Sequence, residues 1–163
     1  MENNSPVLAS VTIQINKYEP HKVANGKNDA TFFVASDDID MADLQRYRQE
    51  TKTECLIAIN TTNKDYDCLE LADNVISCSP DEVQLVMQAF QLLHSGSGFI
   101  GMDWNEVKWA ISSGRNIEFL HGMASGENCV ALACEQLIPK LKNLSSNYPI
   151  TNMMINMFAD ISF

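Results

Sequence analysis

The sequence lacks several features that define large classes of proteins. It contains no uninterrupted run of about 18 apolar residues that could span a bilayer as a helix. Its first residues, 1–6, carry neither a basic cluster nor an apolar stretch, so they do not resemble a secretory signal. Glycine is scarce, at 7 of 163 residues, and neither G-x-x-x-x-G-K-[ST] nor G-x-S-x-G occurs. We therefore expect a cytoplasmic protein without a phosphate-cradling loop behind a strand.

The five cysteines and three histidines form no pattern typical of a disulfide framework or a metal site. The cysteine count is odd, and no C-x-x-C, H-x-x-x-H or H-E-x-x-H occurs. Small buried thiols in a reducing compartment explain such cysteines better than cross-links or zinc. We expect no metal and no other cofactor. A hydrolase site assembled from distant Ser, Cys, His and Asp residues has no local support in the sequence.

Acidic residues dominate the charge. The chain has 21 Asp and Glu against 11 Lys and Arg, a formal charge of −10, and residues 29–82 alone hold 13 acidic and 4 basic side chains. This balance disfavours nucleic acid and anionic membranes as partners. The acidic segment is either a solvated surface or a contact surface for a basic protein. With 45% hydrophobic residues, the chain fits one domain, 1–163, that buries a core.

The first third of the chain alternates between strand and helix patterns. Apolar and polar residues alternate over 11–15, which predicts a strand, and 17–29 predicts a loop; together they make up an N-terminal part, 1–29. Continuous apolar runs at 31–35 and 55–59 predict strands buried on both sides. A short helix is expected between them, near 41–49, after an aspartate-rich N-cap region. Strand, helix, strand in this order predicts a right-handed parallel crossover.

Helices dominate the middle of the chain. Ser79 and Glu82 form a capping box with proline between them, which predicts a helix to about residue 94. Asp103 and Glu106 form a second box, which predicts a helix to about residue 114. Ser125 and the glycine after it are expected to open a third helix. Its expected inward-facing residues are Val130, Ala133, Cys134, Leu137, Ile138 and Leu141.

These elements predict an α/β fold. Two further strands are expected, at 116–123 and 153–158. We expect the strands near 31–35, 55–59 and 153–158 to share one mixed or mostly parallel sheet, with three helices of the 80–142 region packed on it. Residues 30–163 would then form the α/β body. We interpret Trp104 and Trp109 as packing residues rather than a ligand platform.

One stretch resembles a known family. Gly98–Lys108 reads G-F-I-G-M-D-W-N-E-V-K and is similar to G-L-I-N-x-D-F-A-D-V-[KR], the loop after the long central helix of FtsZ, the bacterial tubulin-like division GTPase. His121–Asn128 resembles the family's G-x-A-S-G-E-[DN], and Met153–Ala159 resembles its V-L-V-N-I-T-[AG]. More loosely, Cys55–Asn60 resembles the strand before that helix, and Leu71–Ile76 its E-A-D-N-V-L. The likeness is collinear over about 52–160 and implies a fold like the FtsZ C-terminal domain.

The chain also departs from that family. The nucleotide-binding half, with its glycine-rich phosphate loop, is absent, as are the last strands of the C-terminal domain. The strand near 11–15 could fill that edge of the sheet. In the loop, glycine stands at 101 where the family has asparagine, Asp103 is retained, and Glu106 is one methylene longer than the family's aspartate. In the family these carboxylates enter the neighbouring subunit's nucleotide pocket and position the attacking water. The changes at 101 and 106 should damage hydrolysis more than docking.

The resemblance implies a candidate interaction loop, which consists of Gly101, Asp103, Trp104 and Glu106. The alternative is that Asp103 and Glu106 only cap their helix. Ser125, Gly126 and Glu127 form a second candidate, either an anion site at a helix start or an ordinary cap.

The sequence leaves three functions open. The resemblance implies a non-enzymatic interaction protein that docks on or caps FtsZ or another tubulin-like filament, either alone or as a homo-oligomer. The alternative from size and charge is an acidic binding module unrelated to division, such as a small dimeric secretion chaperone. The third is an enzyme whose site is assembled from scattered residues.

Overall fold

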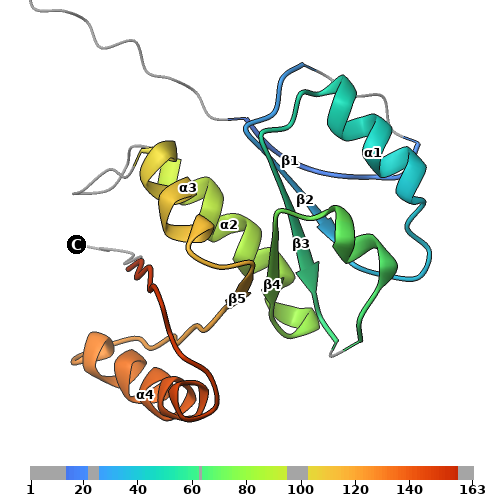
Figure 1. Cartoon of the computed structure of the whole chain (residues 1–163). Helices are drawn as coiled ribbons and strands as arrows, with labels where there is room; N and C mark the ends of the chain where they lie inside the picture. Colours follow the sequence, from blue (N-terminus) through green and yellow to red (C-terminus); the bar gives the residue numbers. More distant parts are fainter. Residues whose placement is uncertain (1–13, 22–25, 63, 95–102, 158–163) are drawn as a thin grey trace, which may run out of the picture.

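The computed structural model describes residues 14–21, 26–62, 64–94 and 103–157, which form an α/β domain around a five-stranded sheet (Figure 1). The strands are β1 (Ile15–Lys17), β2 (Ala30–Val34), β3 (Cys55–Asn60), β4 (Asn74–Ser77) and β5 (Asn116–Glu118). The helices are α1 (Met41–Glu50), α2 (Val83–His94), α3 (Trp104–Ser112) and α4 (Cys129–Asn147), with short 3-10 turns η1 (Asp67–Leu71) and η2 (Pro80–Glu82). All four strand pairs are parallel, in the order β1-β2-β3-β4-β5.

Two helical layers cover the sheet, and the alternation of side chains along its strands builds a core on each face. Phe33 of β2 packs in one core with Leu44 and Tyr47 of α1, next to η1. Its neighbour Phe32 points to the other face and meets Phe90 of α2, with ring centroids 5.1 Å apart. The central strands β2 and β3 are therefore buried on both sides, as their continuous apolar runs predict.

The strand order has a consequence for the connections. Each strand lies beside the next one in sequence. The β2–β3 and β3–β4 connections pass over the face of α1 and η1, whereas the β4–β5 connection passes over the opposite face through α2 and α3. In a parallel sheet with sequential order, connections on opposite faces have opposite hands. Either the β4–β5 crossover or the two crossovers on the other face therefore depart from the usual right-handed rule.

Most of the predicted elements are confirmed. The strands near 31–35 and 55–59, the helix near 41–49 and the helices after both capping boxes lie where the sequence indicates. The sheet is parallel throughout. At the start of the chain, β1 covers Ile15–Lys17; of the strand predicted over 11–15, residues 11–13 lie outside the described residues and Gln14 is not part of β1. The strand predicted over 116–123 ends at Glu118.

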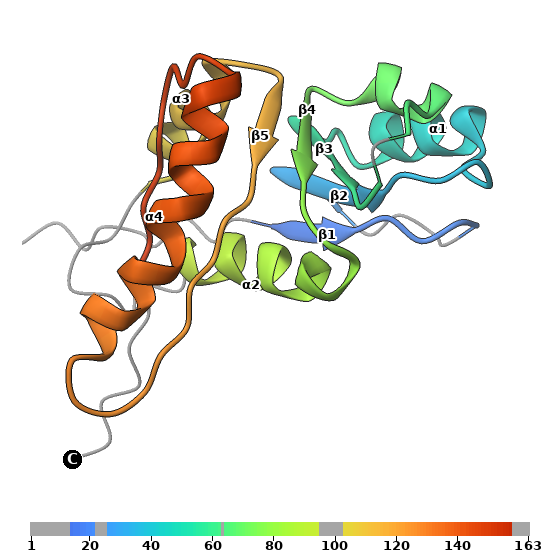
Figure 2. The ribbon, with the colours of Figure 1, turned by 90° about the horizontal axis from the view of Figure 1, so that it is seen from below.

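Two predictions for the C-terminal part are wrong. Residues 153–157 form no strand, so this segment adds nothing to the sheet. The third helix, α4, does not pack on the sheet and contains no buried residue; Val130 and Ile138, predicted to face inward, are 51% and 47% exposed. Figures 1 and 2 show α4 away from the central strands. The amphipathic pattern is present, but α2 and α3 already cover the nearer face of the sheet.

Candidate functional site

The start of α3 carries the two carboxylates of the candidate interaction loop. Asp103 is the N-cap residue: its Oδ1 accepts a hydrogen bond from the Glu106 backbone N–H at 2.8 Å, and Glu106 Oε2 accepts one from the Asp103 N–H at 2.9 Å. The predicted capping box is thus confirmed. Both side chains are exposed, and within the described residues the second oxygen of each carboxylate has no hydrogen-bond partner. Helix capping therefore leaves these oxygens available to a partner.

The two tryptophans of α3 have different surroundings. Trp104 is half-buried and packs against the core under α2 and α3, as expected of a packing residue. Its indole N–H is buried and has no hydrogen-bond partner among the described residues. Trp109 is 71% exposed, so the interpretation of this residue as a packing residue is wrong. The reason is its position, since Val107 and Ile111 supply the buried side of α3 and Trp109 lies on another side.

Gly101, the first residue of the candidate interaction loop, lies outside the described residues. Together with Gly96 and Gly98 it has the spacing G-x-G-x-x-G, which dinucleotide-binding loops also have. Such a loop follows a strand and opens a helix. Here the spacing follows helix α2. It therefore carries no prediction of a nucleotide site.

Ser125, Gly126 and Glu127 lie in an exposed turn before α4. Gly126 has a φ of +81°, a conformation that favours glycine. The N-cap residue of α4 is Asn128, and its side chain makes no capping hydrogen bond. The prediction that Ser125 caps this helix is therefore wrong: the turn places it three residues too early. Nothing else at this helix start indicates an anion site.

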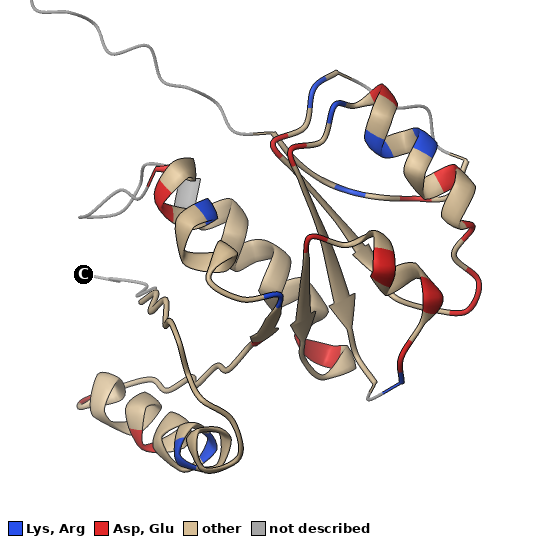
Figure 3. Ribbon diagram, in the orientation of Figure 1, with Lys and Arg blue, Asp and Glu red and all other residues tan. Residues whose placement is uncertain are grey.

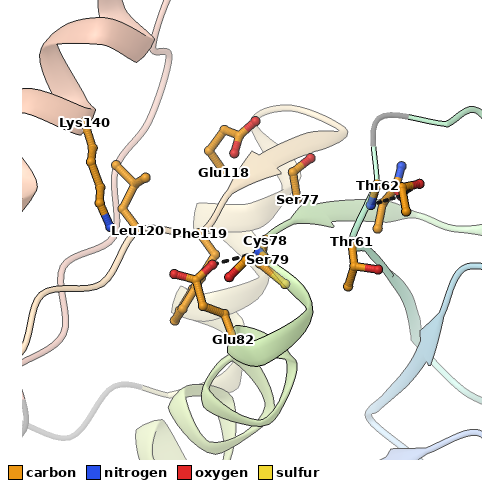
Figure 4. Close-up of a pocket in the computed structure, with 11 residues that line it drawn as sticks. Thr61, Thr62, Ser77, Cys78, Ser79, Glu82, Glu118, Phe119, Leu120 and Lys140 are labelled. Atoms are coloured by element: carbon orange, nitrogen blue, oxygen red, sulfur yellow. Dashed lines mark hydrogen bonds between the residues drawn. The ribbon is translucent and has the colours of Figure 1, made fainter.

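A polar pocket that the sequence did not predict lies at the carboxyl edge of the sheet. Its volume is about 250 Å³, and Figure 4 shows side chains from the ends of β3, β4 and β5 around it. The lining residues are Asn60, Thr61, Thr62, Ser77, Cys78, Ser79, Glu82, Glu118, Phe119, Leu120 and Lys140. This edge is the usual ligand position in parallel α/β sheets. The volume is below the roughly 300–1,000 Å³ of small-molecule sites, so we assign no ligand to it.

The carboxylate of Glu82 at this pocket makes structural contacts. Glu82 Oε2 accepts a hydrogen bond from the Ser79 N–H at 2.8 Å, and Glu82 Oε1 lies 2.7 Å from His121 Nδ1. Burial alone would raise the pKa of the Glu82 carboxyl, but hydrogen bonds from Ser79 and His121 outweigh it and hold the pKa below its ordinary value. Burial also raises the pKa of the Cys78 thiol, which weakens it as a nucleophile. The Glu82–His121 pair fastens the segment after β5 to the start of α2.

A second carboxyl-edge position, between β2 and α1, is filled by aspartates. Asp40 caps α1, accepting hydrogen bonds from the N–H groups of Ala42 and Asp43 at 2.9 and 3.2 Å. Asp37 in the same turn pairs with Lys64, whose ammonium lies 2.5 Å from its Oδ2. In nucleotide-binding α/β proteins a phosphate occupies this kind of helix start. Here the carboxylate of Asp40 accepts the N–H groups of the helix start.

The described residues hold no cluster of three or more His, Cys, Asp or Glu side chains that could bind a metal. Within the same ranges, no helix is both long and apolar enough to cross a membrane. No family model matches the sequence, and the searches of curated proteins and of solved structures found no match either. A function for this chain must therefore be argued from its residues.

Proposed function

We propose that this chain is a non-enzymatic interaction protein that docks through the start of α3 on the end of a tubulin-like filament, FtsZ or a relative of it. The observation that carries the proposal is the exposed pair Asp103 and Glu106, each with one carboxylate oxygen outside the capping box. The resemblance of residues 98–128 to the FtsZ loop and the segment after it indicates the kind of partner. The half-buried Trp104 between them anchors this helix start to the core.

The aspartates at the start of α1 favour a capping role over a catalytic one. A full filament subunit presents a loop on one side and a nucleotide pocket on the other, and so can extend the polymer. In this chain the helix start that would receive phosphate carries Asp37, Asp38 and Asp40 instead. A copy that docks through its α3 loop thus offers no pocket to the next subunit. Such capping would need few copies per filament.

Sedimentation of FtsZ with GTP in the presence of the full chain tests this proposal. We expect wild-type protein to reduce polymer mass or length, and Asp103→Asn to lose most of this effect, because asparagine keeps the N-cap but removes the charge. The matched control is Asp38→Asn, which removes one exposed charge far from α3. If equimolar wild-type protein leaves polymer mass and length unchanged, the capping proposal fails.

The runner-up is an acidic binding module, and the uneven charge supports it. Residues 29–82 carry a balance of 13 acidic to 4 basic side chains, and Figure 3 shows acidic residues around α1 and η1 and in the adjoining loops. A partner on this face would be basic, and its complex would weaken as salt is added. Unchanged FtsZ sedimentation together with salt-sensitive binding of a basic protein would favour this second function.

A further inference from the structure

Helix α4 carries an apolar stripe that nothing in the described chain covers. Val130, Cys134 and Ile138 are spaced four residues apart, which places them along one side of the helix. Val130 is 51% exposed, Ile138 is 47% exposed, and the Cys134 thiol is exposed as well. Scattered apolar residues on a surface need no explanation, but a continuous stripe on a 19-residue helix does.

A different side of α4 attaches it to the rest of the protein. The half-buried residues of the helix are Cys129, Ala133, Leu137, Leu141 and Leu144. At this side the chain passes so close that a Cβ on Gly122 would lie 2.5 Å from the Ala133 carbonyl oxygen. Gln136 also exchanges two hydrogen bonds with the Met123 backbone, at 3.1 and 2.9 Å. The stripe is thus not the attachment surface of the helix.

We propose that a second copy of this chain covers the stripe, with the two α4 helices packed antiparallel about a two-fold axis at Cys134. The stripe is symmetric about that residue, because Val130 precedes it by four positions and Ile138 follows it by four. An antiparallel pair places Val130 against Ile138 of the partner subunit, and the two Cys134 thiols face each other across the axis. A stripe that matches itself in this way is what an isologous interface requires.

Charge agrees with this pairing. Lys142 continues the stripe beyond Ile138, and Glu127 lies just before its other end. The antiparallel arrangement brings each Lys142 near the partner's Glu127, so two unlike pairs flank the apolar contact.

The charge of the C-terminal part of the chain does not oppose it either. Residues 103–157 hold 5 acidic and 4 basic side chains. In Figures 1 and 2, the acidic α1 half lies at the end of the molecule away from α4. Both observations favour a second copy over a strongly charged partner at this surface.

The mass of the full chain in solution tests the dimer. By sedimentation equilibrium under reducing conditions we expect wild-type protein at twice the chain mass of 18.2 kDa, and Ile138→Glu at the monomer mass. The control is Asn143→Glu, which adds the same charge at an exposed position nine residues from Cys134, on the opposite side of the helix, and should stay dimeric. A monomeric wild type, or a dimeric Ile138→Glu protein, would overturn the proposal.

Two further experiments test the arrangement within the dimer. Mild oxidation with a copper(II) complex should join the two Cys134 thiols, which lose two protons and pass two electrons to the copper. Cys134→Ser should abolish this cross-link but leave the mass doubled.

Lys142→Glu should weaken the dimer, and adding Glu127→Lys should restore it. Failure to cross-link, or no rescue by the double exchange, contradicts the antiparallel register. These outcomes do not depend on FtsZ, so they are separate from the proposed function.

Discussion

The side chain of Asp43 attaches the residues just after β1 to helix α1. Asp43 on α1 is 9% exposed and accepts a hydrogen bond from the Tyr18 hydroxyl at 2.6 Å and another from the His21 N–H at 3.2 Å. Arg46, one turn along the helix, forms an ion pair with the same carboxylate. The hydrogen bonds from Tyr18 and Arg46 lower the pKa of Asp43 from 3.8 to about 2. A single carboxylate therefore holds the chain after β1 against α1.

This pKa predicts how stability depends on pH. Because the pKa of Asp43 is lower in the folded than in the unfolded chain, its stabilisation is present above about pH 4 and is lost as the pH falls toward 2. We expect Asp43→Asn to have a lower urea midpoint at pH 7, and its midpoint to fall less than that of wild type between pH 4 and pH 2.5. Glu50→Gln, which removes an exposed partner of Arg46, is the control. Parallel pH profiles for Asp43→Asn and wild type would contradict the assignment.

At the scale of elements, neighbouring polar residues at the start of β4 attach two helices to the sheet. Asp73 accepts a hydrogen bond from the Leu56 N–H at 2.7 Å and pairs with Arg48 of α1. Asn74 is buried, and its amide donates to the carbonyls of Ile111 and Gly114 at the end of α3, at 2.8 and 3.1 Å. Asp73 and Asn74 belong to the segment Leu71–Ile76, which resembles an FtsZ motif. In this structure their side chains attach helices to the sheet.

Removal of the Asn74 amide should loosen α3. Asn74→Ala leaves two carbonyl groups at the end of α3 without their donor, which costs about 2 kcal/mol when such groups are buried. The free energy of unfolding, measured with urea, should fall by about this amount. Asn105→Ala makes the same substitution at an exposed position of α3 and should leave stability nearly unchanged. Equal stability of the two variants would mean that water replaces the amide.

The elements also show what a sequence can predict. Continuous apolar runs and capping boxes are local signals, so β2, β3 and the starts of α2 and α3 could be predicted from them. The short apolar run at 153–158 also predicts a strand. A strand needs a neighbour to pair with, however, and within the described residues this segment has none. Burial of α4 likewise depends on a surface that local sequence does not specify.

The polar pocket could not be predicted for a related reason. Its side chains come from the ends of three strands and from α4, and they meet only once the sheet has formed. His121 fell inside the predicted strand over 116–123, where nothing indicated that it would meet Glu82. The one available signal was the general rule that polar residues after parallel strands gather at one edge of the sheet.

At the scale of the whole molecule, charge is arranged against polyanions. The net charge of −10 creates a field that repels phosphate groups, and most of the excess lies in residues 29–82. Within that segment the turn from β2 into α1 carries Asp37, Asp38 and Asp40. The net charge of the molecule and the aspartates of this turn therefore both disfavour phosphate. Figure 3 shows acidic residues around α1 and η1 and in the adjoining loops.

From this arrangement we expect the isolated protein neither to bind nor to hydrolyse GTP. A phosphate at the start of α1 would meet amides that Asp40 already caps, and it would lie beside two further carboxylates. Lys64 approaches this turn, but its ammonium is already paired with Asp37. Titration calorimetry with GTP and magnesium should give only heat of dilution, with FtsZ as the positive control under the same conditions. A micromolar dissociation constant would place a nucleotide site elsewhere on the chain, and a filament end capped by this protein would then not lack a pocket.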